Sequence, residues 1–222
     1  MNKPNLKIIE TEDGSHSVYR EDLKETYHSF HGAKGESQHV FIEYGLSTIE
    51  KPKINVFEVG MGTGLNVFLT ALEAARRGVS IRYDTIEPIP LDKRLYGALN
   101  YGRKEEELNL LQLIHSSAWD IPVKITAHFE FTKQKKTLES VALEENHFDI
   151  VYFDAFAPSK QPELWSLDNL KKCYNSLIAG GILTSYCAQG QFKRNLKSIG
   201  FEVESLPGAM GKKEMVRARK PC

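Results

Sequence analysis

The sequence predicts one α/β domain built on a mostly parallel, doubly wound β-sheet. Two observations carry this prediction: from residue 53 onward short apolar runs alternate with helical segments, and a glycine-rich turn follows the first run directly. Alternating strands and helices form right-handed crossover units, and these units produce parallel sheets. The 222 residues suit one such domain with a small addition. We assign the domain to residues 53–222 and an N-terminal extension, expected to cover the substrate side, to residues 1–52.

The N-terminal extension is expected to begin with a β-hairpin. Residues 6–20 contain Asp13-Gly14 between runs of β-forming residues, and this dipeptide favours tight hairpin turns. The pattern of residues 26–45 does not decide between helix and strand.

The main domain is expected to start with a buried strand, Ile54–Val59, and a helix, Leu65–Arg77, which Gly78 ends. Further strands are expected over residues 79–87, 121–131, 148–154 and 182–187. Further helices are expected over 91–117 with a break at 101–102, and over 136–145, 163–178 and 192–199. A turn is expected at Gly180-Gly181. The last two strands, 201–206 and 214–219, have only a short connection, which predicts an antiparallel hairpin closing the sheet.

The composition limits the partners and the compartment. There are 29 acidic and 29 basic residues, so any contact with nucleic acid needs a local basic patch. The three cysteines, Cys173, Cys187 and Cys222, show no close pairing, which favours a reducing compartment over a disulfide framework or a zinc site. The chain starts without an apolar signal segment, and its apolar runs are too short to span a membrane. We therefore expect a cytoplasmic protein with no metal and no membrane partner. The sequence leaves the oligomeric state open, with a monomer slightly favoured.

The strongest motif is the glycine loop Gly60–Gly64, with Glu58 two residues before it. The dinucleotide fingerprint G-x-G-x-x-G fails here, since Leu65 or Val67 occupies the last glycine position, and no lysine completes a P-loop. The remaining pattern, acid-x-G-x-G-x-G, resembles the first motif of S-adenosylmethionine-dependent methyltransferases. That cofactor has no phosphate and carries positive charges, so an acid near the loop is favourable. The candidate cofactor contacts in this segment are Glu58, Gly60, Met61, Gly62, Thr63, Gly64 and Asn66.

Two further acids are candidate cofactor contacts. Glu87 ends the second predicted strand, 23 residues after Gly64, where an acid in such folds accepts the ribose hydroxyls. Glu130 lies near the end of the third predicted strand and is a candidate acceptor for the adenine amino group. Phe129-Glu130-Phe131 also fits an ordinary alternating strand.

Asp154 and Phe156 follow the fourth predicted strand and are the candidate catalytic residues. If the first and fourth strands are neighbours, Asp154 faces the glycine loop, where ligands of such sheets bind. Asp154 is expected to orient a substrate amine first and to accept its proton second, because a carboxylate also favours the charged ammonium form. It is also a candidate cofactor contact. Phe156 is expected either to stack on a flipped base or to pack as a buried loop aromatic.

Three blocks resemble the methyltransferase domain of the MnmC family, the bifunctional enzymes of tRNA 5-methylaminomethyl-2-thiouridine biosynthesis. They are Phe57–Asn66, Phe153–Trp165 and Gly208–Met215, with weaker similarity over Tyr27–Ser29 and Glu36–Phe41. The resemblance implies a Rossmann-like class I fold, S-adenosyl-L-methionine as cofactor, and methylation of the aminomethyl nitrogen of a tRNA wobble uridine. It implies cofactor contacts at Gly60–Gly64 and Glu87, and it makes Asp154 the catalytic aspartate with Phe156 beside it. Lys160 and Trp165 match the motif without a derivable role.

The chain also departs from the family pattern. The FAD-dependent oxidase domain of the family has no counterpart in these 222 residues, so a stand-alone methyltransferase is expected. The acid near Glu130 is usually aspartate in the family, and Ala209-Met210 replaces a more aromatic pair.

Contact with tRNA is expected through a local basic patch. Residues 193–222 contain eight basic residues, including Lys212 and Lys213, against three acids. Tyr27, Phe156 and Lys160 are further candidate substrate residues, and Lys133–Lys136 is a second basic run. A solvated basic face explains both clusters equally well.

Three alternatives stay open. One is a methyltransferase or aminopropyltransferase-like enzyme acting on a free small amine, which would need more acids in the site. Another is a cofactor- or tRNA-binding module without catalysis, against which the acids Glu58, Glu87 and Asp154 argue. The third is a zinc protein using His28, His31 and His39, whose spacing matches no known zinc geometry.

Overall fold

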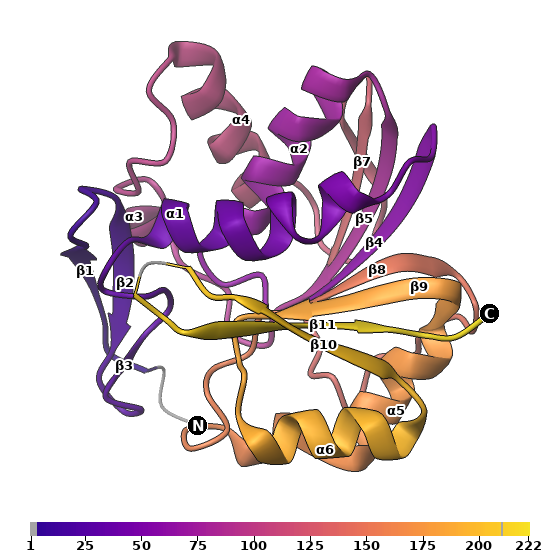
Figure 1. Ribbon diagram of the computed structural model, residues 1–222. Helices are drawn as coiled ribbons and strands as arrows, with labels where there is room; N and C mark the ends of the chain where they lie inside the picture. The colour runs from indigo at the N-terminus through magenta and orange to yellow at the C-terminus, as the bar shows by residue number, and fades with distance from the viewer. Residues whose placement is uncertain (1–3, 210) are drawn as a thin grey trace.

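The computed structural model describes residues 4–209 and 211–222 (Figure 1). Met210, which belongs to the third block of family resemblance, lies outside these described residues. The described residues form one eight-stranded sheet and one three-stranded sheet. Helices cover both faces of the larger sheet, and the smaller sheet lies at one end of it (Figure 1).

The large sheet has a parallel centre and antiparallel edges. Its order is β10-β11-β9-β8-β4-β5-β7-β6. The parallel strands are β4 (Lys53–Val59), β5 (Ser80–Ile86), β7 (Phe129–Gln134), β8 (Phe148–Phe153) and β9 (Leu177–Ser185). The antiparallel strands are β6 (Val123–Thr126), β10 (Glu202–Pro207) and β11 (Glu214–Arg219). The prediction of a mostly parallel sheet closed by an antiparallel hairpin is confirmed.

The order of strands places a switch point between β4 and β8. From β4 the chain builds outward through β5 to β7, and it then returns to the other side of β4 for β8 and β9. A crevice opens at such a point, beyond the carboxyl ends of the strands, because the two crossovers leave in opposite directions. The glycine loop leaves β4 at this crevice.

The two faces of the sheet have separate apolar cores. One core holds Leu65 and Phe68 of α2 (Leu65–Arg77) and Ile114 of α4 (Glu105–Ser116). The other holds residues from α5 (Leu167–Ser176) and α6 (Gly190–Ile199). α2 ends where predicted, because Gly78 adopts a left-handed conformation with φ of 66° that reverses the chain.

Several predicted boundaries in the middle of the chain were wrong. The expected third strand is a hairpin of β6 and β7, so β7 continues to Gln134. Residues 136–145 form turns instead of a helix. The Gly180-Gly181 turn is part of β9, beside an irregularity in its register with β8. A 3-10 turn, η3 (Pro162–Trp165), precedes the shorter α5.

The helical segment over 91–117 breaks near its predicted position. It contains the short α3 (Lys93–Tyr96) and the longer α4. Asp92 caps α3 by accepting a hydrogen bond from the Leu95 amide. The residues between the two helices include the predicted break at 101–102.

The N-terminal residues form the small sheet and a helical segment. The hairpin of β1 (Leu6–Glu10) and β2 (His16–Arg20) is confirmed, and β3 (Glu25–Thr26) pairs with β2. α1 (Ala33–Ser37) continues into a π-helical turn, η1 (Gln38–Glu43), and a 3-10 turn, η2 (Leu46–Thr48), follows. Val40, Phe41 and Ile42 are buried in the same core as α2. Within the described residues, no helix is both long enough and apolar enough to cross a membrane.

Candidate active site at the carboxyl edge of the sheet

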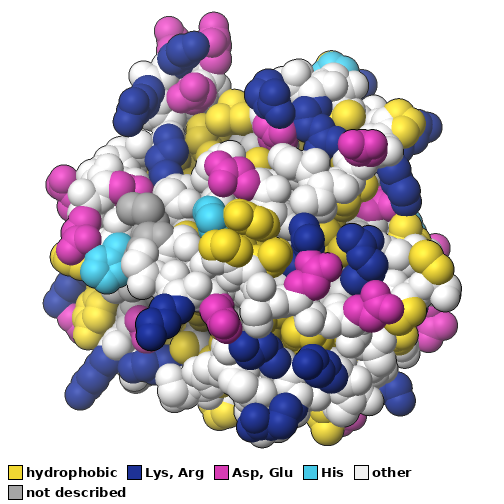
Figure 2. All heavy atoms as spheres, in the orientation of Figure 1, with side chains coloured by type: hydrophobic (Ala, Val, Ile, Leu, Met, Phe, Trp, Pro, Cys, Tyr) yellow, Lys and Arg dark blue, Asp and Glu magenta, His cyan; other side chains and the backbone are white. Residues whose placement is uncertain are grey.

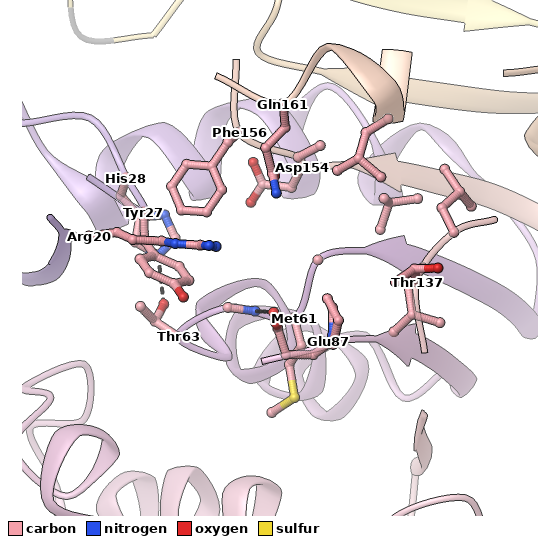
Figure 3. A pocket seen from close by; sticks show the side chains of 18 residues that line it. Arg20, Tyr27, His28, Met61, Thr63, Glu87, Thr137, Asp154, Phe156 and Gln161 are labelled. Atoms are coloured by element: carbon pink, nitrogen blue, oxygen red, sulfur yellow. Dashed lines mark hydrogen bonds between the residues drawn. The ribbon is translucent and has the colours of Figure 1, made fainter. Parts of the chain in front are cut away.

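A cleft with about 670 Å³ of empty space lies at the switch point (Figure 3). Segments from both the sheet and the N-terminal extension line it. The lining residues are Arg20, Tyr27, His28, Val59, Gly60, Met61, Gly62, Thr63, Ile86, Glu87, Pro88, Thr137, Leu138, Asp154, Ala155, Phe156, Gln161 and Leu164. The glycine loop, Glu87 and Asp154, which are distant in sequence, are therefore together.

The glycine loop needs glycine at two positions for two physical reasons. Gly60 and Gly62 have φ of 88° and 51°, a region that disfavours other residues. A Cβ atom on Gly62 would stand 2.8 Å from Cδ1 of Tyr27, and one on Gly60 would stand 3.1 Å from the carbonyl oxygen of Asp154. The loop thus lets the N-terminal extension and the end of β8 approach its backbone closely.

Glu87 anchors the glycine loop. Its Oε2 accepts a hydrogen bond of 2.9 Å from the Gly62 amide, and its Oε1 accepts one of 2.8 Å from the Ile89 amide. The carboxyl group is buried, and burial raises its pKa above the usual range. A carboxylate has about four acceptor positions, so roughly two remain for a ligand in the cleft.

Asp154 stands directly across from the glycine loop. β8 lies next to β4, as the sequence interpretation required, and the Asp154 amide donates to the Val59 carbonyl at 3.3 Å. Its Oδ2 accepts a hydrogen bond of 2.8 Å from Nδ2 of Asn66 in α2. Burial raises the pKa of Asp154 to about 7, although the Asn66 hydrogen bond opposes this. Asp154 is thereby poised to exchange a proton near neutral pH.

Two aromatic side chains form one wall of the cleft. The rings of Tyr27 and Phe156 meet edge to face, with centroids 4.9 Å apart. The Trp165 indole donates to the Phe156 carbonyl at 2.9 Å, and the Tyr186 hydroxyl donates to the Ala155 carbonyl at 2.8 Å. These two bonds fix the loop after β8, and they assign a structural role to Trp165.

Two histidines hold the far end of the glycine loop. His28 shares a hydrogen bond of 2.6 Å with the Thr63 hydroxyl, and His115 bonds the Thr63 carbonyl at 2.9 Å. Burial lowers the pKa of each histidine to about 4. Both are therefore neutral at pH 7, and His115 donates to the carbonyl.

Comparison with known proteins supplies the class of chemistry. A family model described as S-adenosyl-L-methionine-dependent methyltransferase matches residues 110–221. The chain belongs to this family. The family implies S-adenosyl-L-methionine as the cofactor.

The relatives with similar sequences are MnmC proteins. The chain is 29% identical over 212 residues to a protein of Ralstonia nicotianae called tRNA 5-methylaminomethyl-2-thiouridine biosynthesis bifunctional protein MnmC, covering 89% of this chain and 32% of that protein. A protein of the same name from Marinomonas sp. is 30% identical, with 92% and 32% covered. The chain thus spans about a third of the length of these relatives. The resemblance to the methyltransferase part of MnmC is confirmed.

Solved structures confirm the fold. MNMC2 from Aquifex aeolicus has a TM-score of 0.78 at 24% identity, covering 100% of this chain and 73% of that one. Spermidine synthase from Thermotoga maritima has a TM-score of 0.60 at 14% identity, with 99% and 70% covered. The Rossmann-like class I methyltransferase fold is therefore the one predicted.

The residues of the methyltransferase cleft fit the chemistry of the cofactor. The ligand offers a ribose diol, for which Glu87 keeps free acceptor positions. It has no phosphate, and the loop before α2 lacks the lysine that a phosphate cradle uses. Gly60, Met61, Gly62 and Thr63 line the cleft where the methionine part would lie. Gly64 and Asn66 shape the loop from its helix side without lining the cleft.

Glu58 and Glu130, two of the predicted cofactor contacts, lie outside the residues that line the cleft. Glu58 is fully buried behind the loop, where Thr85 Oγ1 donates to it at 2.8 Å and burial raises its pKa to about 8. It is outside the cleft lining and carries a proton at neutral pH. Glu130 is exposed near the amino end of β7, opposite Arg82 of β5. Because β7 continues to Gln134, Glu130 does not lie near the carboxyl end of its strand, where the sequence interpretation placed it.

Most of the predicted basic residues have partners within the protein. Lys160 donates to the Leu23 and Lys24 carbonyls at 2.9 and 3.3 Å. Lys212 forms an ion pair with the buried Glu36. Lys133 is fully buried and donates to carbonyls at the end of α4, which removes it from the second basic run. Direct substrate contacts by Lys160 and Lys212 are therefore not supported, whereas Lys213 is exposed.

The N-terminal extension supplies two cleft residues that sequence reasoning missed. Arg20 and His28 line the cleft beside Tyr27, which was a candidate. His28 follows Tyr27 in a block of weaker family similarity, which was the available signal. Arg20 ends a strand in an ordinary hairpin, and nothing local marks it. The three histidines once considered for zinc have separate partners: Thr63 for His28, Glu12 for His31 and the Pro207 carbonyl for His39.

Proposed function

We propose that the protein transfers a methyl group from S-adenosylmethionine to the aminomethyl nitrogen of a tRNA wobble uridine, converting 5-aminomethyl-(2-thio)uridine to 5-methylaminomethyl-(2-thio)uridine. The buried Asp154, facing the glycine loop beside an aromatic wall, is the observation that carries the proposal. The names of the MnmC relatives support the substrate.

The reacting amine must be neutral, and Asp154 is the group that receives its proton. When bound, S-adenosylmethionine supplies a methyl group on a sulfonium, so a C–N bond forms as the S–C bond breaks and its electron pair stays on sulfur. A carboxylate with an ordinary, low pKa would favour the ammonium form and would accept the proton only at a high cost. A carboxyl group whose pKa is about 7 accepts the proton at little cost near neutral pH. Asn66 holds the accepting carboxylate toward the loop.

Phe156 and Tyr27 suit recognition of a base. Enzymes that act on a nucleobase bind it out of its stack, often against an aromatic side chain. The Phe156 ring faces the cleft between Arg20 and Asp154 (Figure 3). Because Trp165 and Tyr186 fix the backbone beside it, the ring is a preformed platform. Holding the base there would bring its C5 substituent toward Asp154, and positioning of this kind lowers the barrier.

A free polyamine fits the cleft less well than a base. A polycation needs several carboxylates, and the described lining offers Glu87 and Asp154 together with the cation Arg20. Aminopropyl transfer therefore has weaker support than methyl transfer to a base, although the fold resembles spermidine synthase.

The tRNA body would bind outside the cleft, through exposed basic side chains. Figure 2 shows basic side chains interspersed with acidic ones over β10 and β11 and a group of basic ones over α6. Lys193 and Arg217 are paired with Glu214 and Glu204, which weakens the patch expected from composition. Arg194 and Lys197 of α6 and Lys213 are exposed and remain the candidate phosphate contacts.

The test is methyl transfer to a defined nucleoside. The purified protein is incubated with methyl-labelled S-adenosylmethionine and tRNA carrying 5-aminomethyluridine, and the digested nucleosides are separated. Label in 5-methylaminomethyluridine is expected, and tRNA with an unmodified wobble uridine is the matched control. Label in a free amine such as spermidine, with none in tRNA, would contradict the proposal.

A further inference from the structure

Arg20 is a charged group of the cleft to which the proposed function gives no task. It ends β2, and its side chain is only 11% exposed. Figure 3 shows the side chain reaching into the cleft past Tyr27, and its Cζ lies 5.7 Å from the centre of the Phe156 ring. Burying a guanidinium to this extent is costly unless it has anionic partners.

One side of the guanidinium is already occupied. Nε and Nη2 each donate to the Asp22 carboxylate at 2.9 Å. This two-bonded contact fixes the plane of the group, as arginine–carboxylate pairs do. Within the described residues Nη1 has no hydrogen-bond partner, although the other nitrogens are engaged. The contact with Asp22 therefore leaves Nη1 of Arg20 free to bind a ligand.

Contacts of the N-terminal extension hold the backbone around this arginine in place. The Tyr27 amide donates to the Val18 carbonyl at 2.9 Å, which joins the residue after β3 to β2. The Lys160 ammonium, in the loop after β8, donates to the carbonyls of Leu23 and Lys24. The backbone before and after Arg20 is thus held in place, which reduces the entropy lost when the side chain binds a ligand.

Arg20 is the fixed positive charge of the cleft. Among the lining residues in the described part of the chain, the other titratable side chains are Glu87, Asp154, Tyr27 and His28, and His28 is neutral because its pKa is lowered. Both ligands of the proposed reaction bring an anion into this space: the cofactor has a carboxylate and the nucleotide has a phosphate. A preorganised arginine binds either of these groups strongly.

We propose that Arg20 is the anion anchor of the cleft, donating from Nη1 to an oxygen anion of a bound ligand, either the carboxylate of the cofactor or a phosphate next to the target nucleoside. This inference rests on the proposed function for its two ligands. It makes the N-terminal extension a binding element of the site, in addition to a cover.

The experiment compares R20Q and R20K with the wild type. Calorimetry measures the Kd of S-adenosylhomocysteine, which keeps the carboxylate, and of 5′-methylthioadenosine, which lacks the whole amino-acid part. Filter binding measures the Kd of tRNA over a range of salt. R76Q is the matched control, because Arg76 forms an ion pair with Glu73 on α2 and lies outside the cleft lining. Thermal melting checks that each variant is folded.

Losing one charge-assisted hydrogen bond is expected to weaken binding of the correct ligand about tenfold or more. If the carboxylate is the ligand, R20Q raises the Kd of S-adenosylhomocysteine and leaves the Kd of 5′-methylthioadenosine unchanged. If a phosphate is the ligand, tRNA binding weakens and its salt slope falls by about one. R20K keeps the charge but lacks the planar guanidinium with its several donors. Its affinity is expected to lie between those of R20Q and the wild type.

Two outcomes overturn the assignment. One is unchanged binding of both S-adenosylhomocysteine and tRNA in folded R20Q. The other is an equal loss of affinity for S-adenosylhomocysteine and 5′-methylthioadenosine, which would indicate a disturbed adenosine site. Neither measurement requires turnover, so a failure of methyl transfer to tRNA in the wild type is separate from a failure of the anchor.

Discussion

The two sides of the cleft are built in different ways. The sheet side consists of the glycine loop, Glu87 and Asp154 at the ends of buried parallel strands, and its polar contacts are short and local to the crevice. The extension side consists of Arg20, Tyr27 and His28 on a small sheet that is held by side-chain contacts to the domain. We infer that the sheet side carries the proton chemistry and a cofactor contact at Glu87, whereas the extension side supplies the charge and the aromatic ring that orient a bound ligand.

The largest effect is expected from Asp154, the proton acceptor on the sheet side. Asp154→Asn keeps the shape and removes the acceptor, so kcat should fall by about a hundredfold or more. Cofactor affinity should change little, because the loop and Glu87 remain. Single-turnover methyl transfer together with cofactor calorimetry measures both. Normal turnover in the variant would remove Asp154 from the chemistry.

The pH dependence of the same reaction sharpens this assignment. The acceptor must be ionised, and burial raises the pKa of Asp154 to about 7, so kcat/KM should rise with pH and level off above about 7. Deprotonation of the free amine is a separate step at higher pH. Asp154→Asn should remove the step near pH 7 and leave only the dependence of the amine. A wild-type profile that is flat between pH 6 and 8 would contradict this interpretation.

Glu87 tests the cofactor half of the sheet side. Glu87→Gln retains one acceptor oxygen but loses the carboxylate that holds the Gly62 and Ile89 amides. Cofactor binding should weaken about tenfold, through both the ribose contact and a looser loop. Calorimetry with S-adenosylhomocysteine measures the change, and R76Q again serves as the control. Unchanged affinity would place the ribose elsewhere.

The comparison between the two sides also explains what the sequence could predict. The glycine loop and Asp154 were predictable because a strand, a tight turn and a helix follow one another directly, so the local pattern fixes where the side chains emerge. Glu130 was misplaced because Phe129-Glu130-Phe131 alternates in the same way wherever the strand ends, and the turn before Phe129 was not recognised. Arg20 was missed because its place in the cleft depends on how the small N-terminal sheet packs against the main domain.

Lys212 shows the same limit at long range. The sequence placed Lys212 in a surface basic patch, whereas the structure pairs it with Glu36, which lies 176 residues away in the sequence. The Lys212 ammonium also lies 4.3 Å from the centre of the Tyr186 ring. The pair joins the turn after β10 to α1 close to the loop after β8, a contact that only the folded chain creates.

This ion pair predicts a moderate loss of stability. Among the described residues, Lys212→Met leaves the buried Glu36 carboxylate with the Ser29 amide as its one hydrogen-bond donor. The free energy of unfolding should fall by about 1–3 kcal/mol, less than for a fully buried pair because the Lys212 side chain is 34% exposed. Adding Glu36→Gln should recover part of the loss, since no unpaired charge remains. Urea unfolding of both variants measures this, and additive losses would mean that the two residues are not coupled.

The smallest effect is expected from Lys213, which borders this ion pair but faces solvent. Lys213→Gln should weaken tRNA binding only a few-fold and reduce the slope of log affinity against log salt by about one, because one phosphate contact releases roughly one counterion. Lys135→Gln tests the second basic run in parallel, because Lys135 is also exposed and lines a hollow with Trp119. If Lys135→Gln flattens the slope and Lys213→Gln does not, the tRNA body lies across the β7 side of the molecule. Lys213 would then have no part in tRNA binding, and the tRNA body would approach the cleft past Asn5 and Leu6 of the extension, which line the same hollow as Lys135.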